Sequence, residues 1–271
     1  MRPHDTASAW ECVGTAASIA MHIIAISNQK GGVGKTTTAV KLATGLAREG
    51  QRSLLIDLDP QANATYALVG ATELSGTVYD LLLSTSAFDK VRQKTSQEGL
   101  DLLPADIDLA GAEVDLLSAI GGQTRLRAAL GKLTEPYDYV LIDTPPSLGL
   151  LTINALAAAE AVLIPVSVSL FALKGLAQLH ETIAKVKGGL DHPSLHVLGI
   201  LPTLCDRTRV SREVLATLRE HCRPLVLASA IPKNVTVEEA HGRGASLYDY
   251  APHSKGALAY QQLVKEVLAH G

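Results

Sequence analysis

A glycine-rich octapeptide close to the amino end of the chain carries the side chains best suited to phosphate chemistry. Its sequence is Lys30-Gly31-Gly32-Val33-Gly34-Lys35-Thr36-Thr37. Glycines allow a backbone to curl around phosphate oxygens without Cβ clashes, and the N–H groups at the start of a helix attract anions. The second lysine of such a loop can reach the β- and γ-phosphates, and the threonine after it can bind Mg²⁺. The spacing therefore predicts a phosphate-binding loop, with Lys35 on the phosphates and Thr36 on the metal.

The segments on either side give this loop the context that phosphate binding requires. Residues 22–27 form a short apolar run, which is typical of a buried strand. Residues 36–48 follow the loop and place Val40, Ala43 and Leu46 on one face of a helix. The alternative is a glycine turn with a chance lysine, and that reading does not account for a strand before the loop and a helix after it.

Aspartates follow two later strands and would meet the loop at the same edge of a sheet. Asp57 and Asp59 follow an apolar run at 53–56, and Asp143 follows another at 139–142. An aspartate at that edge can hold a Mg²⁺-bound water or orient the water that attacks a phosphate. We expect Asp59 and Asp143 to act on Mg²⁺ through water. We expect Asp57 to be structural, or to contact the residues that bind the metal and not the metal itself.

Strands and helices alternate along the rest of the chain. Further strands are expected at 100–103, 161–166 and 196–201, and further helices at 76–83, 124–133, 173–186, from an N-cap at Ser211 to 221, and at 255–269. This alternation predicts an α/β fold, a single-domain P-loop NTPase with a mostly parallel twisted sheet and helices on both faces. Pro145 and Pro146 must turn the chain after Asp143. Residues 21–271 contain no repeat or convincing linker and are expected to be one domain.

Composition supports a globular protein that works in a reducing compartment. Of the 271 residues, 47% are hydrophobic and only 19% are charged, which excludes a disordered chain. The formal charge of −3 excludes an overall basic coat but not a local basic patch. Cys12, Cys205 and Cys222 are widely spaced and are expected to be reduced thiols. No run of 18 apolar residues occurs, so no transmembrane helix and no membrane partner are expected.

The first 20 residues are interpreted as a leader outside the domain. The run at 7–20 faintly resembles a signal peptide, but Glu11 interrupts it and a cytoplasmic nucleotide site argues against export. Met21 is the alternative start of translation. The sequence leaves both readings of the leader open, as a dispensable or disordered extension or as a wrongly assigned start.

The loop departs from the ordinary phosphate-binding pattern, and this departure points to one family. The ordinary pattern has glycine where this chain has Gln29, and the chain adds Lys30 at the head of the loop. The octapeptide resembles the deviant Walker A box of the ParA/MinD ATPases. The resemblance implies that ATP and Mg²⁺ are bound, and that Lys30 reaches the nucleotide of a second copy in an ATP-sandwich homodimer. Lys30, Lys35 and Asp59 are the catalytic residues that it implies.

Longer phrases resemble the ParA/Soj branch, which segregates chromosomes and plasmids. They are Asp57-Leu58-Asp59-Pro60-Gln61-Ala62-Asn63-Ala64-Thr65, Asp143-Thr144-Pro145-Pro146, Ile231-Pro232-Lys233-Asn234-Val235, and Ser254-Lys255-Gly256-Ala257 with Tyr260. The first two resemble the switch I and switch II segments of the family, where Asp59 matches the residue assigned to hydrolysis. Pro232 and Asn234 match positions that contact adenine. The resemblance covers 21–271.

Other branches of the superfamily match less well. MinD-like proteins end in a basic amphipathic helix that binds membrane, whereas residues 261–269 are typical of a docked terminal helix. Relatives of the nitrogenase iron protein need cluster cysteines near the switch segments, and Cys205 and Cys222 lie far downstream. Tyrosine autokinases carry a C-terminal tyrosine cluster, which Tyr248 and Tyr250 alone do not make.

The ParA/Soj resemblance implies non-specific DNA binding by the ATP dimer and stimulation by a ParB-like partner, in the cytoplasm and on the nucleoid. Candidate phosphate contacts are Arg207, Arg209, Arg212, Arg219, Arg223, Lys233 and Lys255. Thr236 and His253 stand where similar proteins often have arginine, which puts the affinity for DNA in doubt. Two alternatives remain open: the same ATPase positioning a protein cargo such as a chemoreceptor cluster or carboxysome, and a nucleotide-binding regulatory scaffold.

Overall fold

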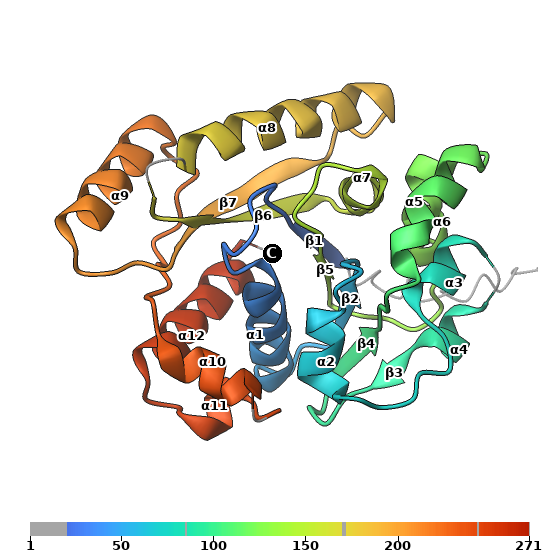
Figure 1. Ribbon diagram of the computed structural model, residues 1–271, viewed down its shortest axis with the longest axis horizontal. Helices are drawn as coiled ribbons and strands as arrows, with labels where there is room; N and C mark the ends of the chain where they lie inside the picture. Colours follow the sequence, from blue (N-terminus) through green and yellow to red (C-terminus); the bar gives the residue numbers. More distant parts are fainter. Residues whose placement is uncertain (1–20, 85, 170–171, 243, 271) are drawn as a thin grey trace, which may run out of the picture.

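The chain folds around one seven-stranded sheet with helices on both faces (Figure 1). The computed structural model describes residues 21–84, 86–169, 172–242 and 244–270, without the side chains of 172–174, 238, 241 and 242. The order of the strands is β3-β4-β2-β5-β1-β6-β7, and β1 lies inside the sheet between β5 and β6. Only β3 runs antiparallel to its neighbour. The predicted α/β fold with a mostly parallel sheet is confirmed.

The strands of this sheet are short, and those inside it are almost wholly apolar. Their bounds are β1 His22–Ile26, β2 Ser53–Asp57, β3 Gln93–Lys94, β4 Leu100–Leu103, β5 Tyr139–Asp143, β6 Ala161–Ser167 and β7 His196–Thr203. Every residue of β2, β4, β5 and β6 is buried. Strands that are covered on both faces need continuous apolar runs, and this is why the sequence pattern located them well.

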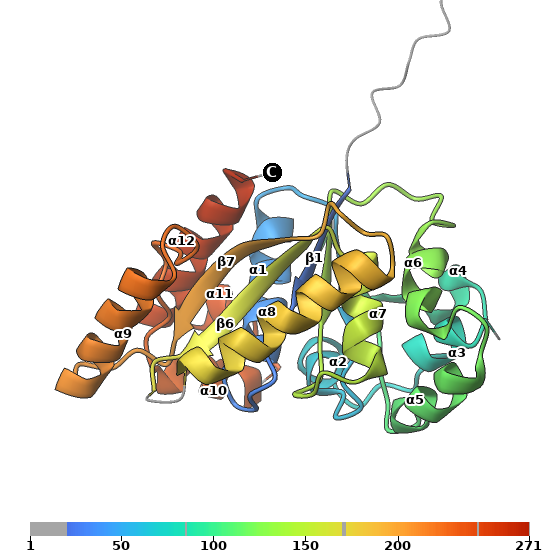
Figure 2. The same ribbon diagram turned by 90° about the horizontal axis from the view of Figure 1, so that it is seen from above.

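Successive residues of each strand feed two separate cores. Leu54, Val140 and Val162 pack on one side with helices α3, α5, α6, α7 and α8. Leu55, Leu141 and Leu163 pack on the other side with α1, α10 and α12. The alternation follows from the period of two along a strand. Figure 2 shows α7 and α8 on one side of the sheet and α1 and α12 on the other.

Helices cover both faces of the sheet, and their bounds agree with the sequence predictions where the apolar period is clear. They are α1 Lys35–Arg48, α2 Asn63–Val69, α3 Val78–Leu82, α4 Phe88–Val91, α5 Leu109–Ser118, η1 Gly122–Thr124, α6 Arg125–Leu130, α7 Leu150–Ala158, α8 Ala172–Gly189, α9 Arg209–His221, α10 Val235–Gly242, α11 Leu247–Tyr250 and α12 Lys255–Leu268. Helices predicted at 36–48, 173–186 and 255–269 differ from α1, α8 and α12 by at most three residues at either end. In the described residues, no helix is both long and apolar enough to cross a membrane.

The sequence pattern misplaced one helix cap and missed several helices. Ser211 was expected to cap α9, and that expectation is wrong. The cap is Thr208, whose hydroxyl accepts a hydrogen bond from the Ser211 amide, while Ser211 itself is buried inside the helix. Both residues favour N-cap positions, so sequence alone does not separate them. Helices α2, α4, α5, α7, α10 and α11 and strand β3 were not predicted. The first 20 residues and the interpretation of them as a leader lie outside the described residues.

Both outer strands of the sheet are shielded. Strand β3 is only two residues long and ends in the charged Lys94. Along β7, Ile200 exchanges backbone hydrogen bonds with Leu225 and Leu227, and Pro202 accepts one from Ile231. Short, charged or covered edges prevent strands of another molecule from adding to a sheet.

Helix α1 packs so closely on α12 that glycine is required at the contact. A Cβ atom added to Gly45 would lie 2.4 Å from Val264 Cγ2 and 2.8 Å from the Tyr248 hydroxyl. That hydroxyl donates to the backbone oxygen of Lys41 at 2.9 Å. The carboxy-terminal helix is therefore fixed directly on the helix that follows the phosphate loop.

We expect Gly45→Ala to lower the free energy of unfolding by about 1–3 kcal/mol, because the new methyl group overpacks this contact. The measurement is urea denaturation of the nucleotide-free protein. Gly188→Ala is the matched control, since its Cβ would enter open space at the exposed end of α8. The control should raise stability by up to about 1 kcal/mol. Equal effects of the two substitutions would contradict the packing argument.

Candidate nucleotide site

The register of three central strands brings the candidate loop and the two acidic segments to one edge. Ile26, the last residue of β1, lies opposite Asp143 at the end of β5. Asp57, the last residue of β2, lies opposite Asp143 from the other side. The loop 27–34 begins at this level and leads into α1. The carboxyl ends of parallel strands thus gather one lysine-rich loop and two carboxylates, which is where open α/β sheets bind ligands.

The loop turns into α1 through two glycines in the left-handed conformation. Gly32 has φ +69° and Gly34, the N-cap of α1, has φ +84°. A side chain at either position would be strained, so glycine is required for this turn. The backbone N–H groups of the first turn of a helix lack partners within the helix and carry its partial positive charge. The loop therefore leads into the positive end of α1, which is the arrangement that the octapeptide predicted.

Lys35 is buried at the start of α1 and is directed toward the acidic edge. Its side chain is only 6% exposed, and its ammonium group lies 3.4 Å from the backbone oxygen of Lys30. Burial lowers the pKa of Lys35, and the carboxylates of Asp143 and Asp59 oppose this change. Little water screens a charge that is buried in this way. The attraction between the Lys35 ammonium and a phosphate group bound beside it would therefore be strong.

Asp143 is the group that most clearly lacks a ligand. The side chain is fully buried, and neither carboxylate oxygen has a hydrogen-bond partner within the described part of the chain. Burial raises its pKa well above the usual range and the nearby Asp57 adds to the rise, while Thr36 and Lys35 act against it. Buried polar atoms are normally satisfied, so these two oxygens fit a site for a hydrated cation. The Thr36 hydroxyl beside them completes an oxygen-rich set suited to Mg²⁺.

Asp57 has a structural task that fully occupies its carboxylate. It accepts hydrogen bonds from the Thr65 amide and hydroxyl, both at 2.8 Å, and from the Asp59 amide at 3.2 Å. The same Thr65 hydroxyl accepts a bond from the Ala105 amide. Burial raises the pKa of Asp57 to about 6, against the lowering effect of the Thr65 bonds. Asp57 thus ties α2 and the segment after β4 to the end of β2, as expected of a structural residue.

Asp59 sits on the turn that Asp57 anchors. Its side chain is 7% exposed, and one carboxylate oxygen accepts a hydrogen bond from the Gln61 amide at 3.0 Å. The turn ends at Ala62, which has a positive φ of 52° and is the N-cap of α2. The electrostatic influence of Asp59 on Lys35 and Asp143 places it at the same edge.

Lys30 stands at the head of the loop, and its ammonium group is held by hydroxyls of its own chain. It donates to Ser169 Oγ at 2.9 Å and to Ser167 Oγ at 3.4 Å, at the end of β6. Its backbone amide donates to Asn28 Oδ1 at 3.0 Å. In the single subunit, Lys30 therefore extends along the rim of the site, whereas Lys35 points into it.

Sequence reasoning missed the residues that fix the loop to the sheet. Asn28 donates to the Pro165 backbone oxygen at 2.7 Å while it accepts from Lys30. Thr203 at the end of β7 donates to the Val33 backbone oxygen at 2.8 Å. Thr144 donates to the Ile26 backbone oxygen at 3.0 Å. The only sequence signal for these anchors was a polar residue at or just after the end of a strand. The bonds of Asn28 to Pro165, Thr203 to Val33 and Thr144 to Ile26 each join segments more than 100 residues apart.

The candidate adenine positions lie on a loop that is bound to the end of β7. Cys205 exchanges backbone hydrogen bonds with Ile231 and Lys233, on either side of Pro232. The Asn234 side chain accepts a bond from the Thr236 amide at the start of α10. Pro232 and Asn234 are half-buried. Their contact with a base stays a prediction. Both cysteines in the described residues, Cys205 and Cys222, are free thiols.

The seven candidate DNA contacts are all exposed. Arg209, Arg212 and Arg219 belong to α9, Arg207 and Arg223 flank it, Lys233 precedes α10, and Lys255 begins α12. Arg209 is already paired with Glu213 at 2.7 Å. Figure 1 shows α9, α10 and α12 on the same side of the molecule, at the left of that view. Their role in DNA binding stays a prediction.

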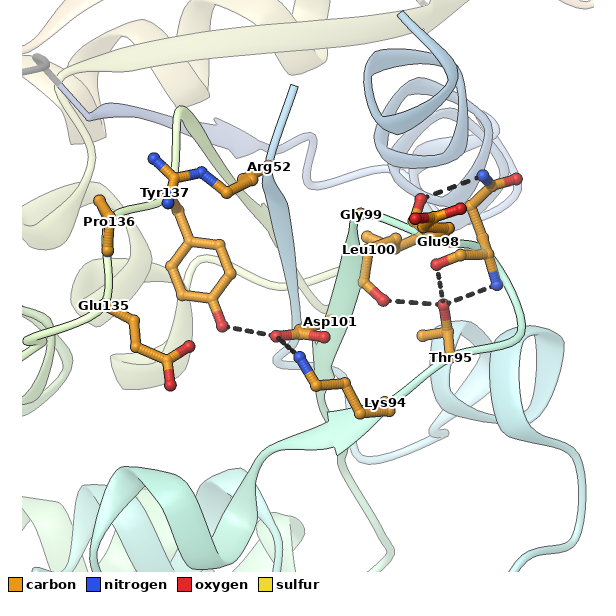
Figure 3. Close-up of a pocket in the computed structure, with 11 residues that line it drawn as sticks. Arg52, Lys94, Thr95, Glu98, Gly99, Leu100, Asp101, Glu135, Pro136 and Tyr137 are labelled. Carbon is orange, nitrogen blue, oxygen red and sulfur yellow. Dashed lines mark hydrogen bonds and ion pairs between the residues drawn. The ribbon is translucent and has the colours of Figure 1, made fainter. Parts of the chain in front are cut away.

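A hollow of about 480 Å³ lies at the opposite edge of the sheet (Figure 3). Arg52, Gly99 and Tyr137 border it, just before the amino ends of β2, β4 and β5. The Tyr137 hydroxyl and the Lys94 ammonium both donate to Asp101, at 2.8 and 3.0 Å. These groups satisfy one another, unlike Asp143, so the nucleotide site is assigned to the carboxyl edge.

Comparison with known proteins agrees with this assignment. A family model described as an AAA domain matches residues 21–196. The chromosome-partitioning ATPase Soj of Thermus thermophilus is 49% identical, over 91% of this chain and 95% of its own length. Sporulation initiation inhibitor protein Soj of Bacillus subtilis is 45% identical, over 92% and 99% respectively. Chromosome partitioning protein ParA of Caulobacter vibrioides is 44% identical, over 92% and 94%.

The chain belongs to the ParA/Soj family. Solved structures resemble this family member over nearly its whole length. Cobyrinic acid a,c-diamide synthase from Mycobacterium smegmatis, with bound ADP and magnesium, is 39% identical with a TM-score of 0.81, covering 93% of this chain and 95% of the other. Cyanothece McdA without ligand is 27% identical with a TM-score of 0.82, covering 92% and 100%.

We expect Asn28→Ala to weaken ATP binding about tenfold, because the loop loses its anchor to β6 and the buried Pro165 oxygen loses its partner, at a cost of about 1–3 kcal/mol. Titration with a fluorescent ATP analogue measures the affinity. Thr182→Ala is the control, since the Thr182 hydroxyl donates to the backbone of its own helix, α8, away from the phosphate loop. An unchanged affinity in the Asn28 variant would show that the loop keeps its shape without this anchor.

Proposed function

We propose that this protein is a Mg²⁺-dependent ATPase of the partition type, which forms an ATP-sandwich dimer and binds DNA in that state. A ParB-like protein would stimulate hydrolysis and so release the dimer, on the nucleoid in the cytoplasm. The observation that carries the proposal is the convergence of Lys35, Asp59 and the unpartnered Asp143 at one edge, in a chain 49% identical to a chromosome-partitioning ATPase.

The residues of the site divide the chemistry among them. The loop N–H groups and Lys35 would hold the phosphates and stabilise the charge that develops on the transferring group. Thr36 would hold Mg²⁺ directly, with Asp143 and Asp59 acting on it through water. The ion would neutralise phosphate charge when bound. Asp59 would orient the attacking water, and the hydrogen bond from its amide to Asp57 supports this role because it fixes the turn.

Lys30 would complete the site of a second copy. It stands on the exposed rim of the loop and is not directed at the carboxylates. A lysine at this place can therefore turn outward without disturbing Lys35 or Asp143. This placement supports a charge supplied between subunits, as the deviant Walker A box implies.

Asp59→Ala is expected to trap the ATP dimer, because hydrolysis loses the group that orients water while the phosphate loop is intact. Sedimentation velocity with ATP and Mg²⁺ should show a stable dimer, and steady-state turnover should fall at least about 100-fold, within the range of a lost acid–base group. Lys35→Ala is the comparison variant and should bind no ATP and stay monomeric. An Asp59 variant that is monomeric with ATP, or hydrolyses at the wild-type rate, would refute this role.

DNA binding is expected to need ATP and to weaken steeply with salt, because phosphate contacts release counterions. The measurement is fluorescence anisotropy with random-sequence duplex DNA, in ATP and in ADP, over a salt series. Arg212→Glu should weaken binding and reduce the slope of log K against log salt by about 1. Lys185→Glu on α8 makes the same charge change on another surface and should leave the slope unchanged. A dimer with no DNA affinity would favour the protein-cargo alternative.

A further inference from the structure

The contact between Lys30 and two serines of β6 concerns the residue that the proposed dimer depends on. Ser167 and Ser169 point to the same side of the strand end, and their hydroxyl oxygens lie 3.5 Å apart. Both accept from the Lys30 ammonium, at 3.4 and 2.9 Å. Ser167 is buried with 9% exposure. We call Ser167 and Ser169 the serine cradle.

The cradle holds a full positive charge with neutral groups only. Ser167 and Ser169 are the only side chains in the described residues that hydrogen-bond this ammonium, and it takes part in no ion pair there. A hydroxyl orients a cation but attracts it less than a carboxylate or phosphate oxygen does. Holding the ammonium in this way fixes its position while leaving its charge uncompensated.

The backbone of Lys30 is fixed independently of its side chain. Its amide donates to Asn28, and its carbonyl oxygen lies 3.4 Å from the Lys35 ammonium. The side chain can therefore leave the serines while the phosphate loop keeps its shape. Lysine has four rotatable side-chain bonds, so its ammonium can sweep outward from a fixed backbone.

We propose that the serine cradle is a positioning device that retains Lys30 in the single subunit and yields it to the phosphates of a second copy. This inference rests on the proposed ATP-sandwich dimer. The transfer exchanges two neutral acceptors for anionic phosphate oxygens, which bind ammonium more strongly. The neutrality of Ser167 and Ser169 keeps the barrier to this exchange low. A carboxylate in the cradle would hold Lys30 in its own subunit and oppose dimerisation.

The test compares two substitutions of equal size in full-length protein that carries Asp59→Ala. Ser169→Asp gives Lys30 an ionic partner, whereas Ser169→Asn supplies a neutral side chain of the same shape. Sedimentation equilibrium at saturating ATP and Mg²⁺ gives the dimer dissociation constant. We expect the Asp variant to dimerise at least about tenfold more weakly than the Asn variant at about 0.1 M salt. We expect this difference to shrink at about 0.5 M salt, because an exposed ion pair is screened.

Adding Lys30→Gln to both variants shows whether the effect passes through Lys30. This substitution should weaken the dimer in both, and in that background the Asp and Asn variants should have equal dissociation constants, as a double-mutant cycle requires for a specific pair. Direct repulsion between the new carboxylate and nucleotide phosphates would persist without Lys30, and that result would overturn the proposal. So would equal constants for Asp and Asn with Lys30 present. If the Asp59→Ala protein forms no ATP-dependent dimer at all, the proposed function itself fails and this inference falls with it.

Discussion

The register between β1, β2 and β5 is the constraint on which the rest of the site depends. Ile26 and Asp57 both lie level with Asp143, so the phosphate loop begins where two carboxylates end their strands. A shift of one residue in β2 or β5 would turn its aspartate to the other face of the sheet, because side chains alternate, and a shift in β1 would displace the start of the loop. The apolar runs of the three strands are buried on both faces and hold this register firmly. Packing in the core thus determines where the charged groups lie at the carboxyl edge of the sheet.

Within this frame, residues of the same type have different tasks. Asp57 is satisfied by three hydrogen bonds and fastens α2, whereas Asp143 is equally buried and has no partner in the described chain. Lys35 is buried against the carboxylates, whereas Lys30 lies on serines at the rim. A buried group that lacks a partner costs stability, and such groups gather where a ligand will supply the missing interaction. The contrast between Asp57, which has partners, and Asp143, which has none in the described chain, therefore marks the ligand site.

The sequence predicted those parts of the molecule whose signals are local. The apolar runs at 139–142 and 161–166, and the glycines of the loop, each carry their signal within a few residues, and the structure agrees with them. Helix α7 was missed because eight of its nine residues are buried, so that it has no exposed polar face and no amphipathic period. Asn28, Thr203 and the serine cradle were missed because their partners lie more than 100 residues away. Tertiary contacts of that kind leave no periodic trace in the chain.

The shielded edges of the sheet have a consequence for how copies can meet. At one end β3 offers two residues and a lysine, and at the other the segment that contains Leu225 and Leu227 already occupies the backbone of β7. Growth of the sheet from one molecule into the next is blocked on both sides, at least as far as the described residues reach. In the proposed dimer, the copies would meet instead at the rim of loops around the phosphate site, where the contact would include the γ-phosphate that hydrolysis removes. A dimer formed through paired strands would be permanent, whereas a dimer formed at this rim would last only until its ATP is hydrolysed.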